Sequence, residues 1–222
     1  MTEQVSALES MDVTVRAVLT GKSPLVMHHP RTADPDDEFT LAISEIVAKK
    51  KAMTPEDRRR KEDLQWRASL YTESVKEDGE LAERAIVPMI WLTRALEAGG
   101  KTLGTGTNSK GAAVFRSVTA SEPFMLLDYD GPQDIAGLAE DPRFRWRTLV
   151  NPNPTASKPV KLPSVRAIFP RWSVTTTLNL VTYMGLSWDD FDKSFRAAGN
   201  LGLGDARKLG YGRFSVRLTK LH

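Results

Sequence analysis

The chain has 222 residues, of which 41% are hydrophobic and 27% charged, a balance typical of soluble globular proteins. This length corresponds to one or two domains and suffices to bury a core without metal or disulfide cross-links. The absence of cysteine excludes disulfides, iron–sulfur clusters, zinc–cysteine sites and cysteine nucleophiles. No apolar run approaches the ~20 residues that span a bilayer, and the polar start of the chain lacks a signal-peptide pattern. We therefore expect a cytoplasmic protein.

The charge is distributed unevenly along the chain. Residues 143–222 contain 14 Lys and Arg against four Asp, whereas the net charge of the whole chain is only +3. Residues 1–142 are therefore net acidic. A basic segment of this kind favours a surface that binds a polyanion. The alternative is that these cations are solvated and scattered over several faces.

The first half of the chain predicts strands and helices in alternation. Residues 12–19 alternate apolar and polar side chains, which predicts a strand. Asp36 or Asp37 can cap a following helix, and Pro55 suits the first turn of a second. Together they predict a helical insertion at about residues 38–76, an exposed segment of mixed charge to which the sequence assigns no function.

A third helix is predicted from Pro88, with Gly99 as its stop. The Gly-rich segment 104–111 predicts a loop, and residues 113–119 and 123–129 predict short strands. The apolar face of the helix is expected to comprise Ile90, Trp91, Leu92 and Leu96.

The last part of the chain predicts a hairpin and then a strand, a helix, a glycine loop and a strand. Two basic, strand-like pieces surround a turn rich in Pro, Asn and Ser at about residues 143–171. Residues 171–183 are β-branched and alternating, Ser187 can cap a helix, and residues 213–221 alternate again. The fold class expected from this order is α+β, with helices on one face of a mainly antiparallel sheet.

The glycine loop is the most informative motif. Glycine permits positive φ and close approach to a ligand, so backbone N–H groups can point at phosphate oxygens. Nearby cations supply charge, and a tyrosine offers a face for base stacking. The loop has neither the strand–helix context of a dinucleotide-binding motif nor the Walker A pattern, and the alternative is a tight connection between helix and strand. Its candidate nucleic-acid-binding residues are Gly202, Gly204, Arg207, Lys208, Gly210, Tyr211, Gly212 and Arg213.

The segment GLGDARKLGYGRF resembles the signature glycine-rich loop of the RAMP superfamily, the ferredoxin-like RNA-binding proteins of CRISPR systems. VTVRAVLTGKSPLVM is similar to the first strand of that family, and AIVPMIWLTRALEAGG to a helix start of its backbone subunits. In the helix start, Trp91 and Thr93 stand where small Ser and Gly are expected. The resemblance implies one RRM-like domain over residues 1–222, with a βαββαβ core.

The resemblance further implies a subunit that coats guide RNA. Because the sequence has no Ser-His-Asp order and no paired carboxylate motif, we expect binding without catalysis, and no cofactor or metal. The hairpin at 143–171 would be a thumb that inserts between guide bases, with Trp146 and Phe169 stacking or wedging unless they belong to the core. Neighbouring copies, or other subunits of a multi-protein complex, would meet along the strand, acidic half against basic third. The thumb cations expected to follow the phosphate backbone are Arg145, Arg147, Lys158, Lys161, Arg166 and Arg171.

Two other functions remain open. A repeat-processing endoribonuclease of the same superfamily would use His28 or His29 as general acid or base, although a histidine pair in a loop more often has a packing role. Some family members cleave target RNA through an acidic residue after the first strand, a place that Asp34, Asp36 or Asp37 could hold. The third function is a single-stranded DNA-binding protein of a phage or mobile element, because no residue here decides recognition of the 2′-hydroxyl.

Overall fold

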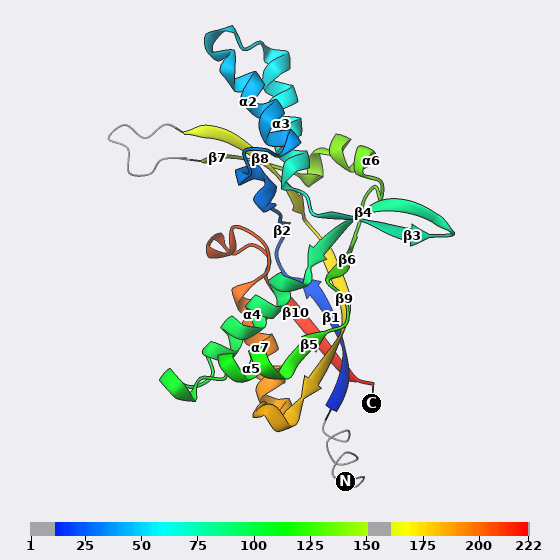
Figure 1. Cartoon of the computed structure of the whole chain (residues 1–222), viewed down its shortest axis with the longest axis vertical. Coiled ribbons are helices and arrows are strands. Elements are labelled where there is room, and N and C mark those ends of the chain that lie inside the picture. The colour runs from blue at the N-terminus through cyan, green and yellow to red at the C-terminus, as the bar shows by residue number, and fades with distance from the viewer. Residues whose placement is uncertain (1–11, 151–160, 222) are drawn as a thin grey trace. The chain divides into compact units, whose positions relative to one another are not determined.

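The computed structural model describes residues 12–150 and 161–221, and its chain divides into two compact units (Figure 1). Within the described residues, no helix combines the length and the apolar character needed to cross a membrane. Unit 1 comprises Met1–Leu25, Ile86–Asp130 and Arg171–His222, and unit 2 comprises Val26–Ala85 and Gly131–Pro170. The strands β2 (Leu25–Val26) and β4 (Glu80–Pro88) lie where the chain passes between units.

Unit 1 is built on an antiparallel sheet in the order β10–β1–β9–β6, with the end of β4 beside β6. Numbered along the chain, its four central strands therefore lie in the order fourth, first, third, second. The short strand β5 also pairs with β9. The strands are β1 (Asp12–Gly21), β5 (Val118–Ala120), β6 (Phe124–Tyr129), β9 (Trp172–Val181) and β10 (Phe214–Lys220).

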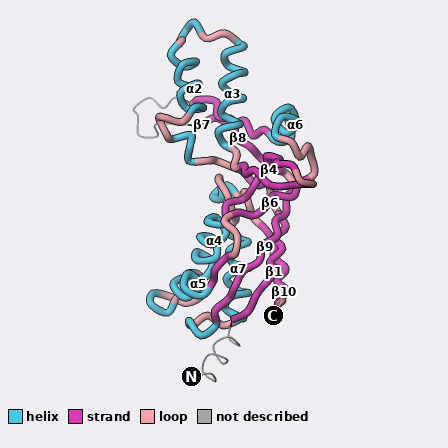
Figure 2. The backbone as a smooth tube through the Cα atoms, turned by 45° about the vertical axis from the view of Figure 1, so that its right-hand side comes forward, coloured by secondary structure: helices cyan, strands magenta, loops and turns pink. Residues whose placement is uncertain are grey.

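Helices cover one face of this sheet (Figures 1 and 2). The alternation of β1 buries Val15, Ala17 and Leu19 completely beneath them, because successive side chains of a strand point to opposite faces. Helix α4 leads into β6, and α7 joins β9 to β10. This is the βαββαβ arrangement, so the α+β class and the ferredoxin-like core are confirmed. The helices are α4 (Met89–Lys101), α5 (Gly111–Ser117) and α7 (Trp188–Leu201).

Gly99 does not stop α4, which continues to Lys101. A Cβ atom at Gly99 would overlap the carbonyl oxygen of Ser194 in α7. The glycine therefore allows the two helices to approach closely. The predicted apolar face is also partly wrong: Leu92 and Leu96 are fully buried, but 55% of Ile90 is exposed.

The strand predicted at 113–119 is wrong, because most of it belongs to α5. Ala113, Val114 and Ser117 are buried, the spacing of one helix face. Only the last part of the segment, from Val118, is extended and pairs with β9.

Unit 2 contains the predicted helical segment and the predicted hairpin. The side chain of Asp37 accepts a hydrogen bond from Phe39 N and caps the first helix, and Thr54 with Asp57 forms a capping box before the second. Both predicted helix starts are confirmed. The elements are α2 (Glu38–Ala48), α3 (Pro55–Ser69), β3 (Thr72–Glu77), α6 (Ile135–Glu140), β7 (Arg145–Val150) and β8 (Leu162–Phe169).

The core of unit 2 joins α3 to the hairpin. The indole N–H of Trp66 donates to the Phe144 carbonyl at 2.8 Å, and Ser69 Oγ accepts from Ala167 N of β8 at 2.8 Å. Phe169 is fully buried, with its ring centroid 5.6 Å from that of Phe144. Phe169 is therefore a core residue, which decides between the two roles that the sequence left open for it. That the whole chain is one RRM-like domain, with the helical insertion and the hairpin as additions to it, stays a prediction.

Candidate nucleic-acid interface

The glycine loop of unit 1 folds back on itself. Leu203 N donates to Gly212 O at 2.9 Å, and Gly212 N donates to Pro24 O at 2.8 Å. Gly202 and Gly212 both have positive φ, at +84° and +70°. A Cβ atom at Gly212 would overlap the Leu203 carbonyl, and one at Gly202 would lie 2.7 Å from Tyr211 O. These two glycines are therefore required by the fold of the loop itself.

Ser23, just after β1, fixes the other side of the loop. Its hydroxyl donates to Gly210 O at 2.8 Å and accepts from Arg213 N at 2.9 Å. The indole of Trp172 donates to Ser23 O at 2.9 Å. The loop is thus attached to β1 and, through Ser23, to the start of β9.

The cations of the loop lie outside this framework. Arg207 and Lys208 belong to a single 3₁₀ turn, Arg207–Leu209, between Ala206 and Gly210, which both have left-handed φ. Arg207, Lys208 and Arg213 are exposed, whereas Tyr211 is half-buried. The structure therefore brings the predicted loop residues together, Gly204 (φ +72°) included; their contact with nucleic acid stays a prediction.

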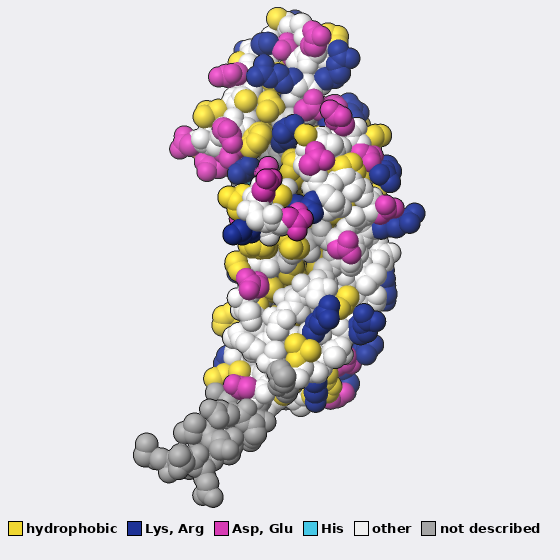
Figure 3. Space-filling model, turned by 90° about the vertical axis from the view of Figure 1, so that its right-hand side faces the viewer, with side chains coloured by type: hydrophobic (Ala, Val, Ile, Leu, Met, Phe, Trp, Pro, Cys, Tyr) yellow, Lys and Arg dark blue, Asp and Glu magenta, His cyan; other side chains and the backbone are white. Residues whose placement is uncertain are grey.

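Within residues 12–150 and 161–221, no helix covers the other face of the unit 1 sheet. On this open face, β1 presents Arg16 and β10 presents Arg217, and both are exposed. Sequence reasoning missed these two residues, although their strands were predicted. Figure 3 views this side of the unit, where white surface is mixed with dark-blue Lys and Arg, yellow hydrophobic side chains and some magenta Asp and Glu.

Three strands of the open face lack the base-stacking platform of an RRM, and β6 directs one half-buried aromatic side chain, Phe124, to this face. RRM sheets stack bases on aromatic side chains, but the side chains that β1, β9 and β10 direct there include no aromatic residue. Trp172 and Phe214 point to the opposite face and are buried. Bases therefore have no aromatic side chain of β1, β9 or β10 on which to stack at this face.

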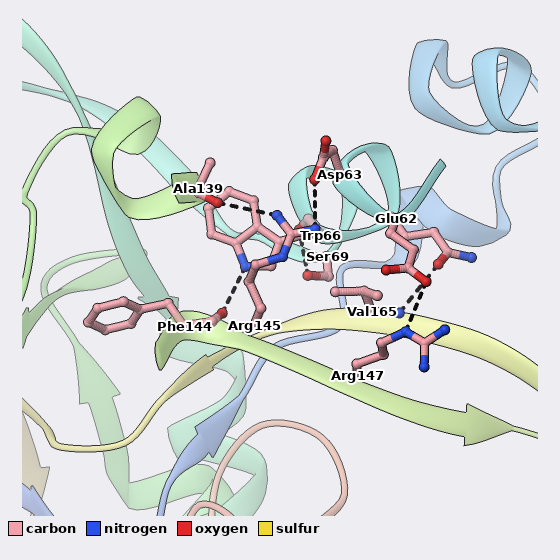
Figure 4. Close-up of polar contacts among 10 residues, drawn as sticks. Glu62, Asp63, Trp66, Ser69, Ala139, Phe144, Arg145, Arg147 and Val165 are labelled. Atoms are coloured by element: carbon pink, nitrogen blue, oxygen red, sulfur yellow. Dashed lines mark hydrogen bonds and ion pairs between the residues drawn. The ribbon is translucent and has the colours of Figure 1, made fainter. Parts of the chain in front are cut away.

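The hairpin arginines have acidic partners (Figure 4). Arg145 pairs with Asp63 of α3 at 2.7 Å and also donates to the Ala139 carbonyl at 3.2 Å. Arg147 pairs with Glu62 at 2.9 Å. These half-exposed ion pairs join β7 to α3, a contact that the sequence did not predict because the partners are more than 80 residues apart. Their binding to phosphate stays a prediction.

The remaining hairpin cations are dispersed. Lys161 is exposed, and Arg166 is half-buried opposite Trp146 in the β7–β8 register. Lys158 lies outside the described residues. Arg171 is exposed and belongs to unit 1, where it lines a shallow hollow with Thr20 and Ser173 of the open face.

The two histidines of the described residues have local partners. His29 Nδ1 accepts from Arg31 N at 3.0 Å, and its ring lies 4.3 Å from that of Tyr71. Burial, and next the nearby Arg31 charge, lower the pKa of His29, so its neutral form is favoured. His28 Nε2 lies 2.9 Å from Thr32 Oγ1, in a polar pocket of about 180 Å³ in unit 2. A catalytic role for either histidine stays a prediction.

The acidic residues after β1 have structural roles. Asp37 caps α2, with its carboxylate 3.5 Å from Arg31 Nε. Asp34 Oδ1 accepts from Asp36 N at 3.0 Å in a tight turn. Across the described residues, no cluster of three or more His, Asp or Glu is placed to hold a metal ion.

Neither protein-family models nor curated protein sequences match this chain. Among solved structures, a chain of type III-B Cmr-beta bound to cognate target RNA matches 99% of this chain with a TM-score of 0.51 and 10% sequence identity. The two chains share a fold. This chain spans 64% of the length of that one. At 10% identity this likeness establishes the fold alone.

Two further structures match with lower scores. A chain of a type IV-B CRISPR complex has a TM-score of 0.46 and 10% identity, over 93% of this chain and 90% of that one. Cmr6 from Pyrococcus furiosus has a TM-score of 0.31 and 10% identity, over 91% of this chain and 97% of its own. Scores below 0.5 do not establish a common fold.

Proposed function

We propose that this protein is an RNA-binding subunit of a CRISPR ribonucleoprotein that coats guide RNA without cleaving it. The glycine loop would hold the phosphate backbone, and the hairpin of unit 2 would supply a second contact. Three things support this proposal: the sequence of the loop, the fold shared with a chain solved in complex with target RNA, and the basic C-terminal third.

The observation that carries the proposal is the construction of the loop. Its backbone is fixed on two sides by hydrogen bonds, from Leu203 to Gly212 and from Ser23 to Gly210. Arg207 and Lys208 lie on the exposed turn between these fixed points, with no acidic partner in the described part of the chain. A pre-organised loop with exposed cations binds phosphate oxygens at a low entropic cost.

The test is the double variant Arg207→Ala/Lys208→Ala. Its affinity for single-stranded RNA should fall about tenfold, because two phosphate contacts of about 0.7 kcal/mol each are lost. The matched control is Lys193→Ala/Arg196→Ala, which removes two cations that pair with Asp189 and Asp192 on α7. Fluorescence anisotropy with labelled RNA measures both, and circular dichroism checks that each variant is folded. Equal affinities in parent and loop variant would reject the loop assignment.

The nature of the nucleic acid is a separate question with its own measurement. The protein purified from cells should carry RNA of discrete length, detected by its absorbance ratio and by sensitivity to ribonuclease. Competition between RNA and DNA of the same sequence should favour RNA; preference for DNA would support the single-stranded DNA-binding alternative. Protein that is free of nucleic acid and binds no added single strand at low salt would contradict the proposal.

The mass of the purified particle tests the assembly. A subunit that coats RNA should elute with further copies of itself or with other subunits along the strand. A monomer that binds RNA one to one, with no added mass on longer RNA, would contradict this part of the proposal.

A further inference from the structure

The open face of unit 1 carries arginines that the glycine loop does not use. The register places Arg16 of β1 opposite Thr219 of β10, and Val18 opposite Arg217. Arg16 and Arg217 are therefore diagonal neighbours on one face, about 7–8 Å apart between their Cα atoms. Neither has an acidic partner among the residues that the structure describes, whereas the hairpin arginines Arg145 and Arg147 both do.

This face also connects to the glycine loop. Arg213, which closes the loop, precedes β10 and lies four residues before Arg217, about 14 Å along an extended strand. The backbone ladder continues to this point, because Lys22 N donates to Arg213 O at 2.7 Å. Arg171 lies beside the same end of the face, where it lines a hollow with Thr20 and Ser173 and also with Asp128 and Asp130. Cations thus extend from the loop onto the middle of the sheet.

Hydroxyl groups surround these arginines. Ser and Thr donate hydrogen bonds to phosphate oxygens in nucleic-acid complexes. No acidic residue occurs in β9 or β10; the carboxylates that border these strands include Asp12 at the far end of β1, Glu122, Asp130, and Asp128 of β6, which accepts from Ser173 Oγ. The hydroxyl-bearing residues that the three strands direct to this face are Thr14, Thr20, Ser173, Thr175, Thr177, Ser215 and Thr219.

An ordinary solvated sheet face would be arranged differently. Such surfaces mix both signs of charge, and opposite charges on neighbouring strands stabilise a sheet whereas like charges destabilise it. Two arginines that are diagonal neighbours, with no carboxylate paired to either, repel each other in the isolated protein. A polyanion on the face offsets that repulsion, and phosphates match the donors present better than bases do, because aromatic stacking partners are absent from these strands.

We infer that the open face of the unit 1 sheet binds the sugar–phosphate backbone of a nucleic-acid strand, continuing the path from the glycine loop through Arg213, Arg217 and Arg16. The inference rests on the proposed function and extends it: the loop holds one part of the strand, and the sheet face holds the adjoining part. Recognition there is by charge and hydroxyl donors and is independent of base sequence.

The first test is Arg16→Gln/Arg217→Gln. Its affinity for labelled single-stranded RNA should fall about tenfold, and the slope of log K against log salt should become shallower by about 1.4, or 0.7 for each lost phosphate contact. The control Lys193→Gln/Arg196→Gln removes the same charge from α7 and should change neither. One outcome separates the inference from the proposed function. If the unmodified protein binds RNA and Arg207→Ala/Lys208→Ala weakens that binding, but Arg16→Gln/Arg217→Gln does not, the inference is overturned and the proposed function stands. A parent that binds no RNA overturns both.

The second test uses the absence of cysteine from the chain. Thr175→Cys places a single thiol at an exposed position of the open face, where a benzophenone-maleimide label can photo-cross-link whatever covers it. Labelled Thr175→Cys should cross-link to bound RNA, and the control Arg196→Cys on α7 should not. Cross-linking to a second copy of the chain, or no cross-linking in a sample shown to bind RNA, would overturn the inference.

Discussion

At the scale of single residues, the glycines of the loop differ in how strongly the backbone requires them. Gly212 combines a positive φ with a position at which a Cβ would overlap the Leu203 carbonyl, whereas a Cβ at Gly210 would meet open space. The four glycines that together suggested a ligand-binding loop are therefore not equivalent. The sequence shows that they are glycines but not which of them the backbone needs.

This difference predicts unequal stability losses on substitution by alanine. Gly212→Ala should lower the free energy of unfolding by ~3 kcal/mol or more, because overlap adds to backbone strain. Gly210→Ala (φ +91°) should cost only about 1 kcal/mol, from the strain alone. Urea unfolding measures both. Equal losses would show that the folded-back backbone does not constrain Gly212.

His29 gives a second prediction at this scale. Its pKa in the folded protein is lowered by burial and by Arg31, with a smaller contribution from His28, while Asp37 raises it. The unfolded chain therefore binds more protons than the folded one just below pH 6.5, and stability should fall as the pH drops from about 6.5 towards the folded pKa, with no effect above that range.

The measurement is urea unfolding at about pH 7.5 and pH 5.5. His29→Asn keeps a side chain that can cap the 3₁₀ turn but does not titrate, so the stability difference between the two pH values should shrink. An unchanged pH dependence in His29→Asn would assign the effect to other groups.

At the scale of elements, helix α4 shows how packing overrides local sequence rules. Glycine near the end of a helical segment usually marks a stop, yet Gly99 lies inside α4 against α7. The same holds for α5, where a segment with Val and Phe forms a helix because its buried residues follow helical spacing.

Gly99→Ala distinguishes the two roles by the sign of its effect. If Gly99 only ended the helix, alanine would be neutral or would stabilise by up to about 1 kcal/mol through helix propensity. The contact with Ser194 predicts the opposite, a loss of about 1–3 kcal/mol as α4 and α7 are forced apart. Urea unfolding provides the measurement, with Arg94→Ala at an exposed position of α4 as control. A stabilised Gly99→Ala would refute the close contact.

At the scale of the whole molecule, RNA binding should depend strongly on salt. The loop cations Arg207 and Lys208 and the face cations Arg16 and Arg217 are exposed and unpaired within the described part of the chain, so each phosphate contact they make should release counterions. The quadruple variant should flatten the plot of log K against log salt by about 2.8, twice the change expected for either pair. A change no larger than that of one pair would show that the two groups do not contact the strand together.

Local signals in the sequence were enough to predict individual elements of the fold. Alternation predicted β1, β9 and β10, the capping residues predicted α2, α3 and α7, and glycine spacing located the loop, because each of these signals depends on residues close together in the chain. Their order was enough to predict an α+β fold.

Which distant residues meet became clear from the three-dimensional packing of the chain. It paired Arg145 and Arg147 with α3, buried Phe169, placed Gly99 against α7 and brought Arg16 beside Arg217, two residues at opposite ends of the chain. Strand register and helix packing fix these contacts through hydrogen bonding and burial across the whole chain, and no short window of sequence contains that information.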